Sequence, residues 1–287
     1  MNASNQGPTA LVGIRSELGY LREHVAVDGE TLHPWGRLAL GRWQPGGVAV
    51  ALVTTAIGKV SAAMAVQGAI DACRPRLLIN CGSAGALAPD LAVGAVVLAE
   101  WVLAHDQGVY FDPDTASAAG PDGFIHAGSP LPEGRRRSFP ADPALLARVT
   151  QAARQAGITL RVGPIASGDQ VIFQGQRKRW LHETFGALAV ENEGAAVAQV
   201  AHCHDLPWLV LRGVSDTADG EAAYDFTQLV LYDEDLEQSP RLAQAALALR
   251  QGARSPALLL RAARFRQGQR QAMTAIAALL DTCLPVL

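Results

Sequence analysis

Short runs of apolar residues alternate along the chain with longer segments in which apolar positions recur at helical spacing. The runs at 9–14, 48–54 and 76–80 are apolar almost throughout, which is typical of strands that are covered on both faces. Helices are predicted to begin after the first two runs, at Arg15 and at Lys59. Buried strands that alternate with helices indicate an α/β fold with a parallel or mixed sheet.

The same alternation continues through the middle of the chain. It predicts three further strands and two helices, at 94–100, 160–165 and 208–212, and at 141–157 and from Ala195 onward. The polar stretch between about 105 and 140 is rich in Gly, Pro, Asp and Ser, so we interpret it as a loop with room for a short hairpin. Loops of this length in compact domains are often functional.

Beyond residue 220 the pattern changes to a charged segment and then to an Ala-, Leu- and Arg-rich tail. We interpret this tail as two or three helices. Residues 9–287 are expected to form one domain, in which 229–263 are a helical insertion and 1–8 a disordered N-terminal segment.

Composition and charge exclude several classes of protein. With 287 residues, 49% of them apolar and 18% charged, the chain is long enough to bury a substantial core. The net charge of −3 provides no basic field for nucleic acid, and we interpret the run Arg135 to Arg137 as a solvated loop. No uncharged run reaches the length of about 18 residues that a membrane span needs, and the polar N-terminus lacks the pattern of a signal peptide.

The cysteines and histidines give no sign of a metal site. The 4 cysteines lie far apart without a Cys-x-x-Cys pair, which argues against zinc and against a disulfide framework. His202 and His204 straddle Cys203, but residues two apart on a helix do not face one ligand. We therefore expect a cytoplasmic protein with free thiols, no metal and no cofactor.

Small and polar residues follow the predicted strands at the points where the strands end. They are Glu17, Thr55, Gly82 to Gly85, Ser167 to Asp169, Glu191 with Glu193, and Ser215 with Asp216. Ligands bind outside the carboxyl ends of strands in open α/β sheets, so these residues predict one site. Two acidic clusters lie in this set, one before the helix at Ala195 and one after the strand at 208–212. They suggest that the site binds a sugar and protonates a leaving group.

The glycine-rich segment at 82–85 has little side-chain bulk. A ligand is thereby able to approach the backbone amides, and the Ser83 hydroxyl is able to donate a hydrogen bond. A tight turn that ends the strand explains the same residues. The chain contains neither Gly-x-x-x-x-Gly-Lys-Ser/Thr nor Gly-x-Gly-x-x-Gly, so neither a nucleotide phosphate loop nor a dinucleotide-binding fold is supported.

Four motifs stand in the order that one known family shows. They are Ile-Asn-Cys-Gly-Ser-Ala-Gly-Ala-Leu-Ala-Pro at 79–89, Ser-Gly-Asp-Gln-Val-Ile at 167–172, Val-Glu-Asn-Glu-Gly at 190–194 and Arg-Gly-Val-Ser-Asp-Thr-Ala-Asp at 212–219. On these motifs the chain resembles the nucleoside phosphorylase superfamily, and most closely its methylthioadenosine/S-adenosylhomocysteine nucleosidase branch. The likeness covers residues 9–228 and resumes in the final helix. It implies a three-layer α/β/α fold with a central mixed, twisted sheet, to which this chain adds a helical C-terminal insertion.

The resemblance implies catalytic roles for three acids, because cleavage of an N-glycosidic bond passes through an oxocarbenium-like sugar. Asp216 matches the general acid that protonates the purine, and Glu193 matches the carboxylate that binds the ribose hydroxyls. Glu17 matches the carboxylate that activates the attacking water, which Ser83 helps to hold. Alternatives remain for each acid: a turn cap for Asp216, a helix N-terminal charge for Glu193 and a surface helix position for Glu17. Glu191 is interpreted as such a helix N-terminal charge or as a partner of the site residues.

The resemblance also places a set of residues around the substrate. They are Ile14, Ile57, Ala84, Gly85, Val171, Ile172, Phe173, Asn192, Arg212, Ser215 and Phe226. Asn192 stands where the nucleosidase branch carries Met, and Val171 stands where the family has an aromatic residue that stacks on the base. Side chains two apart in an extended segment share a face, so Phe173 is predicted to supply that ring.

Water is favoured over phosphate as the nucleophile. Phosphorylases of this fold use cations to bind phosphate; Arg15 lies near the first strand end, but 81–87 contains no basic residue, and Glu17 brings a negative charge. We expect hydrolysis of the N-glycosidic bond of a purine nucleoside, a 5′-substituted adenosine such as methylthioadenosine or S-adenosylhomocysteine, with release of the free base and the sugar. Phosphorolysis and a silent nucleoside-binding module are the alternatives. A futalosine-like or adenosyl-hopane-like substrate stays open, because the insertion follows the pocket aromatic, Tyr224 or Phe226.

Family members form homodimers, and we expect one here. In the family, the loop after a His-Asp pair walls the pocket of the neighbouring chain, and in this chain His105-Asp106 leads to Val109, Tyr110 and Phe111. The alternative is that these three apolar residues pack under their own loop.

Overall fold

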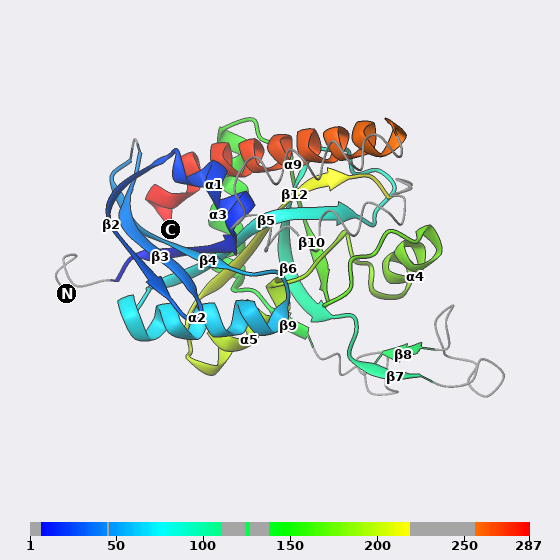
Figure 1. Ribbon diagram of the computed structural model, residues 1–287, viewed down its shortest axis with the longest axis horizontal. Helices are drawn as coiled ribbons and strands as arrows, with labels where there is room; N and C mark the ends of the chain where they lie inside the picture. Colours follow the sequence, from blue (N-terminus) through cyan, green and yellow to red (C-terminus); the bar gives the residue numbers. More distant parts are fainter. Residues whose placement is uncertain (1–6, 45, 111–123, 127–137, 219–255) are drawn as a thin grey trace.

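The computed structural model describes residues 7–44, 46–110, 124–126, 138–218 and 256–287 (Figure 1). Several features expected from the sequence lie outside these residues. They are the expected pocket residues Tyr224 and Phe226, Phe111, the basic run at 135–137, residues 1–6 of the expected disordered segment and residues 229–255 of the expected insertion. The last part of that expected insertion, 256–263, belongs to the C-terminal helix.

A mixed sheet forms the centre of the described part of the chain. Its order is β11-β10-β6-β12-β5-β1-β4-β3-β2, with β9 paired to β6. The strands are β1 (Thr9–Ile14), β2 (Val25–His33), β3 (Gly36–Trp43), β4 (Val48–Thr55), β5 (Leu77–Ala86), β6 (Val96–Ala104), β9 (Ser138–Pro140), β10 (Leu160–Ser167), β11 (Ala189–Glu191) and β12 (Trp208–Asp216). A separate short antiparallel pair joins β7 (Gly108–Tyr110) to β8 (Phe124–His126). It lies in the polar stretch between about 105 and 140, where the sequence allowed a short hairpin.

Helices cover both faces of the sheet (Figure 1). One layer holds α1 (Arg15–Arg22), α3 (Pro143–Gln155) and the long α9 (Pro256–Cys283), which is followed by a short 3-10 turn at Leu284–Val286. The opposite layer holds α2 (Lys59–Cys73) and α5 (Gly194–Cys203), whereas α4 (Gly175–Phe185) lies at the end of the sheet beyond β12. The three-layer α/β/α fold predicted from the sequence is confirmed.

Side-chain size distinguishes the two apolar layers. The face of α2 that packs on the sheet consists of small residues, so this helix lies close to the strands; they are Ala62, Ala65, Val66 and Ala69. The layer under α1, α3 and α9 contains larger side chains, among them Leu18, Leu145, Met273 and Ile276. Each fully buried Leu or Ile contributes about 1.5–3 kcal/mol to folding, so these two layers hold the strand ends in fixed positions. Among the described helices, none has the length and apolar character to cross a membrane.

The sheet contains two parallel blocks that run in opposite directions, while β3 and β2 extend it beyond β4 in antiparallel pairs and β9 pairs antiparallel with β6. One block is β12, β5, β1 and β4, and the other is β6, β10 and β11. They meet in antiparallel pairs, β12 with β6 and β5 with β11, the second of which sets Gly85 opposite Val190. This junction brings the 82–85 segment alongside the acidic segment at 191–193.

The predicted end of β5 was wrong. The sequence suggested that the strand beginning near Arg76 stops before the glycine-rich segment, but β5 continues to Ala86. The two glycines, Gly82 and Gly85, serve close approach: a Cβ on Gly82 would collide with the side chains of Arg212 and Glu17, and one on Gly85 would lie 3.1 Å from Asp216 Oδ2. The missing side chains therefore leave room for the residues of the site.

Candidate active site

A cavity of about 590 Å³ opens at the junction of the two strand blocks. This volume lies within the range of about 300–1,000 Å³ that is usual for small-molecule sites. All the residues to which the resemblance gave a catalytic or substrate-binding role, and which the structure describes, line it: Ile14, Glu17, Ile57, Ser83, Ala84, Gly85, Val171, Ile172, Phe173, Asn192, Glu193, Arg212, Ser215 and Asp216. Among the strand-end residues, Gly82 and Ser167 to Asp169 do not line it. Residues from the ends of six strands or from the segments that follow them thus converge, as the strand-end pattern predicted; the strands are β1, β4, β5, β10, β11 and β12.

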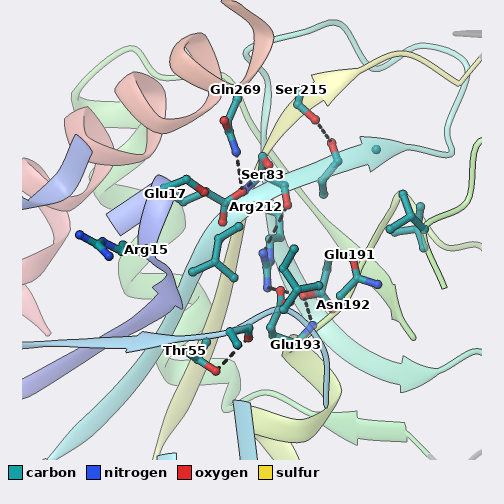
Figure 2. Close-up of a pocket in the computed structure, with 18 of the residues that line it drawn as sticks. Arg15, Glu17, Thr55, Ser83, Glu191, Asn192, Glu193, Arg212, Ser215 and Gln269 are labelled. Carbon is teal, nitrogen blue, oxygen red and sulfur yellow. Dashed lines mark hydrogen bonds and ion pairs between the residues drawn. The ribbon is translucent and has the colours of Figure 1, made fainter. Parts of the chain in front are cut away.

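Arg212, on β12, occupies the centre of the site (Figure 2). Its Nη2 donates to Glu193 Oε2 at 3.1 Å and also to Glu191 and to Asn80, while Nη1 donates to the backbone oxygen of Ser83 at 3.3 Å. The side chains of the Arg212–Glu191–Glu193 cluster are 2%, 1% and 6% exposed. Charges this deeply buried are tolerated because they are paired and hydrogen-bonded.

Glu193 is held at the base of the cavity from two sides. Its Oε1 accepts a hydrogen bond of 3.0 Å from the backbone N–H of Gly58, in the loop after β4, and its Oε2 faces Arg212. Burial is the main cause that raises the pKa of Glu193 to about 7; Arg212 acts against it, and the neighbouring Glu191 acts in the same direction as burial. The Glu193 carboxylate is therefore fixed in place and poised to accept hydrogen bonds from hydroxyl groups of a ligand.

Glu191 supports this arrangement from the end of β11. Its carboxylate accepts from the backbone N–H groups of Glu193 at 2.9 Å and Gly194 at 2.8 Å, and also from the Ser167 hydroxyl. The Glu191 carboxylate therefore links the first N–H groups of α5 to Arg212. This agrees with its interpretation as a helix N-terminal charge and a partner of the site residues.

Glu17 lies on the opposite side of the cavity, on the first turn of α1, and is 3% exposed. The alternative interpretation as a surface helix residue was wrong. Its Oε1 accepts from the backbone N–H of Ser83 at 2.9 Å, from the Ser83 hydroxyl, and from Gln269 Nε2 at 3.4 Å (Figure 2). Burial raises the pKa of Glu17, opposed by Arg212 and by the hydrogen bonds from Ser83. A carboxyl with a raised pKa is suited to accept a proton near neutral pH.

Asp216 ends β12 where the pairing with β5 shifts register between Val214 and Asp216. Such a bulge redirects the side chain that follows it. Asp216 Oδ1 accepts from the Ser215 hydroxyl at 2.9 Å, and Oδ2 accepts from Lys178 Nζ at 3.0 Å. The 23% exposed side chain of Asp216 thus combines fixed geometry with access to the cavity.

Apolar side chains and one amide complete the part of the cavity wall predicted from the sequence. Val171 and Phe173 both line the cavity, as expected for alternate positions of an extended segment. Asn192 also lines it, and its Nδ2 donates to the backbone oxygen of Gly168. The Asn192 amide thus ties the acidic segment to the loop after β10.

The comparison with known families agrees with this geometry. The family model described as the phosphorylase superfamily matches residues 10–251. This chain belongs to the phosphorylase superfamily. The motifs at 79–89, 167–172, 190–194 and 212–219, on which the resemblance rested, all lie within the matched range.

Similar members of the superfamily share most of their length with this chain. A 5′-methylthioadenosine/S-adenosylhomocysteine nucleosidase of Mycobacterium bovis is 32% identical over 240 residues, which are 77% of this chain and 89% of that protein. An S-adenosylhomocysteine nucleosidase from Streptococcus pyogenes, solved with 5-methylthiotubericidin, superposes with a TM-score of 0.68 at 28% identity, covering 100% of this chain and 99% of its own. A futalosine hydrolase mutant of Helicobacter pylori gives a TM-score of 0.58 at 28% identity, with coverage of 72% and 88%.

Further residues line the cavity, although no sequence pattern assigned them to it. Phe265, Arg266 and Gln269 come from α9, and Leu32 and Arg37 come from the β2–β3 hairpin. Phe265 and Gln269 are four apart and so share one face of a helix, but nothing in their spacing shows which element that face meets.

Among the described residues, no group of His, Cys, Asp and Glu is arranged to hold a metal ion.

Gly82 gives a direct test of how tightly the site is packed. A Cβ at this position would collide with Glu17 Oε2 and Arg212 Nη1, and these side chains have to move to accommodate it. We expect Gly82→Ala to lower kcat/KM by about 10- to 100-fold, since displacement of catalytic groups by about 1 Å has effects of this size. The steady-state rate of base release at several substrate concentrations gives kcat/KM for the variant. Gly19→Ala is the matched control, because nothing lies within 4 Å of the added methyl group, and a G82A enzyme as active as G19A contradicts the assigned packing.

Proposed function

We propose that this chain hydrolyses the N-glycosidic bond of a purine nucleoside, a 5′-substituted adenosine such as methylthioadenosine or S-adenosylhomocysteine, releasing the free base and the sugar. The observation that carries the proposal is the separation of three carboxylates within one cavity: Glu193 beside Arg212, Asp216 at the end of β12, and Glu17 with Ser83. Each carboxylate has different partners, so the three are suited to different tasks.

The chemistry requires one proton to be accepted and one to be donated. Glu17 takes a proton from water, whose oxygen forms the new bond to the anomeric carbon. The bond between that carbon and the base nitrogen breaks, its electron pair stays with the base, and Asp216 donates a proton to the base. Glu193 accepts hydrogen bonds from the sugar hydroxyls and stabilises the positively charged, oxocarbenium-like sugar.

The charges around the nucleophile support water over phosphate. Glu17 is hydrogen-bonded to both the N–H and the hydroxyl of Ser83, so a phosphate bound at Ser83 would meet a carboxylate. A specific observation keeps phosphorolysis as the second candidate: besides Arg212, the cavity is lined by Arg15, Arg37 and Arg266. One of these, Arg37, pairs with Glu30 at 2.7 Å.

The distinguishing experiment is base release from a panel of purine nucleosides, in buffers with and without phosphate. The panel contains methylthioadenosine, S-adenosylhomocysteine, futalosine, adenosine and inosine, because the similar proteins include both an S-adenosylhomocysteine nucleosidase and a futalosine hydrolase. The proposal expects free base and free sugar at equal rates in both buffers. Activity that depends on phosphate overturns hydrolysis, and no base release in either buffer favours a nucleoside-binding module.

We also propose a homodimer that covers exposed apolar side chains, among them Leu32, Val60 and Met64. Their exposed fractions are 74%, 71% and 53%, and Met64 shares a shallow hollow with His33 and Trp35. Val60 and Met64 are four apart on α2, so they lie on one face. Exposed apolar patches of this kind mark contacts between proteins. We expect Val60→Asp to lower the mass in light scattering from dimer to monomer, while Val162→Asp, at a residue 41% exposed on β10, leaves it unchanged.

The proposal also includes a single domain over residues 9–287, in which 229–263 are a helical insertion. It further includes a cytoplasmic location. The free cysteines support the location, since thiols persist in reducing compartments: Cys73, Cys81, Cys203 and Cys283. Cell fractionation with a tagged chain tests it.

A further inference from the structure

Lys178 is a buried charge that the proposed mechanism has not used. It lies on α4, where its side chain is 1% exposed, and it does not line the cavity. Its Nζ donates to Asp216 Oδ2 at 3.0 Å and to the backbone oxygen of Thr217 at 3.1 Å. A buried ammonium is costly unless it is paired, so the position of Lys178 behind Asp216 requires an explanation.

We propose that Lys178 is a positioning residue for the general acid of this site. This inference rests on the proposed nucleosidase function and extends it. Lys178 holds Oδ2, and the Ser215 hydroxyl, which also contacts the backbone oxygen of Ala84 at 3.2 Å, holds Oδ1. With both oxygens held from behind and from the side, the carboxyl group presents one orientation to a base in the cavity.

The charge of Lys178 has a second effect on Asp216. When Asp216 donates its proton to the departing base, a carboxylate forms beside the ammonium group, and their attraction lowers the energy of that state. Lys178 keeps its own proton throughout, so one proton moves, from the Asp216 carboxyl to the base nitrogen. Among the described residues, Lys178 is the charged group in ion-pair contact with Asp216, while Arg212, Glu191 and Glu193 line the same cavity from β12, β11 and the start of α5.

The tests use Lys178→Met, which removes the charge at similar length, and Lys178→Arg, which keeps it. We expect K178M to lower kcat by about 10- to 100-fold with little change in KM, because the acid loses its orientation. K178R retains most of the activity. Arg179→Met is the control, since Arg179 is the next residue on α4 and is exposed.

A double-mutant cycle with Asp216→Asn distinguishes an action of Lys178 through Asp216 from a merely structural role of Lys178. If Lys178 acts through Asp216, K178M has no further effect on base release in the D216N background; an equal loss in both backgrounds overturns the inference. A measurement without substrate separates this inference from the proposed function. In crystal structures without nucleoside, the Asp216 carboxyl is expected to change orientation in K178M and to keep it in K178R, and an unchanged orientation in K178M overturns the inference even where no nucleoside is cleaved.

Discussion

Replacement of Asp216 by Asn is expected to reduce the rate of base release by about 10²- to 10⁴-fold, the usual contribution of a general acid. The amide keeps the shape of the side chain at the end of β12, but it has no acidic proton to give to the departing base. Nucleoside binding depends on the cavity as a whole, so we expect KM to change much less than kcat. Measurement of kcat and KM by following the free base checks both values.

A matched control excludes a loss through misfolding. Asp90→Asn makes the same chemical change at a side chain that is 64% exposed and pairs with Arg161 at 2.6 Å, away from the cavity. We expect D90N to keep full activity. A D216N enzyme that retains activity within about threefold of D90N shows that the base leaves without a proton from Asp216, and the assignment of the acid is then wrong.

Much of the fold was predictable because its strands are short, apolar and separated by helices of clear periodicity. The strand at 9–14 and the helices that begin at Arg15 and Lys59 match the structure at their first residues. The β2–β3 hairpin was not predicted. Its residues at 25–43 mix apolar with polar and charged positions, and β2 is largely exposed, so no continuous apolar run marks it.

The candidate site was predictable to the extent that it follows strand ends in sequence. Glu193 and Asp216 stand directly beyond β11 and at the end of β12, and a sheet brings such ends together. Gln269 reaches Glu17 from a helix 252 residues further along the chain, and Lys178 reaches Asp216 from α4. Contacts of this kind depend on how helices dock, which no local pattern encodes. The end of β5 was missed for a related reason: its glycines suggested a turn, but they are required by side chains from two other elements.

Replacement of Arg212 by Met is expected to have the largest effect on stability. Its guanidinium is the partner of Glu191 and Glu193 and lies near Glu17, and all four side chains are buried. Without it the buried carboxylates have no cation, and removal of one partner from a buried ion pair costs about 3–5 kcal/mol. We expect the free energy of unfolding in urea to fall by this amount. Arg161→Met, in a pair whose side chains are 41% and 64% exposed, is expected to cost about 0–1 kcal/mol.

The pH dependence of the R212M deficit identifies its cause. Arg212 lowers the pKa of Glu17 and of Glu193, and burial already raises that of Glu193 from 4.5 to about 7, so R212M raises both further. A carboxyl whose pKa is raised by folding contributes stability that is present below its unfolded value and is lost as the pH rises through its folded value. The deficit is therefore expected to be small near about pH 5 and to grow towards about pH 8, as these carboxyls lose their protons. A deficit that stays constant over this range indicates lost packing of the Arg212 side chain, and the charge cluster is then not what stabilises the site.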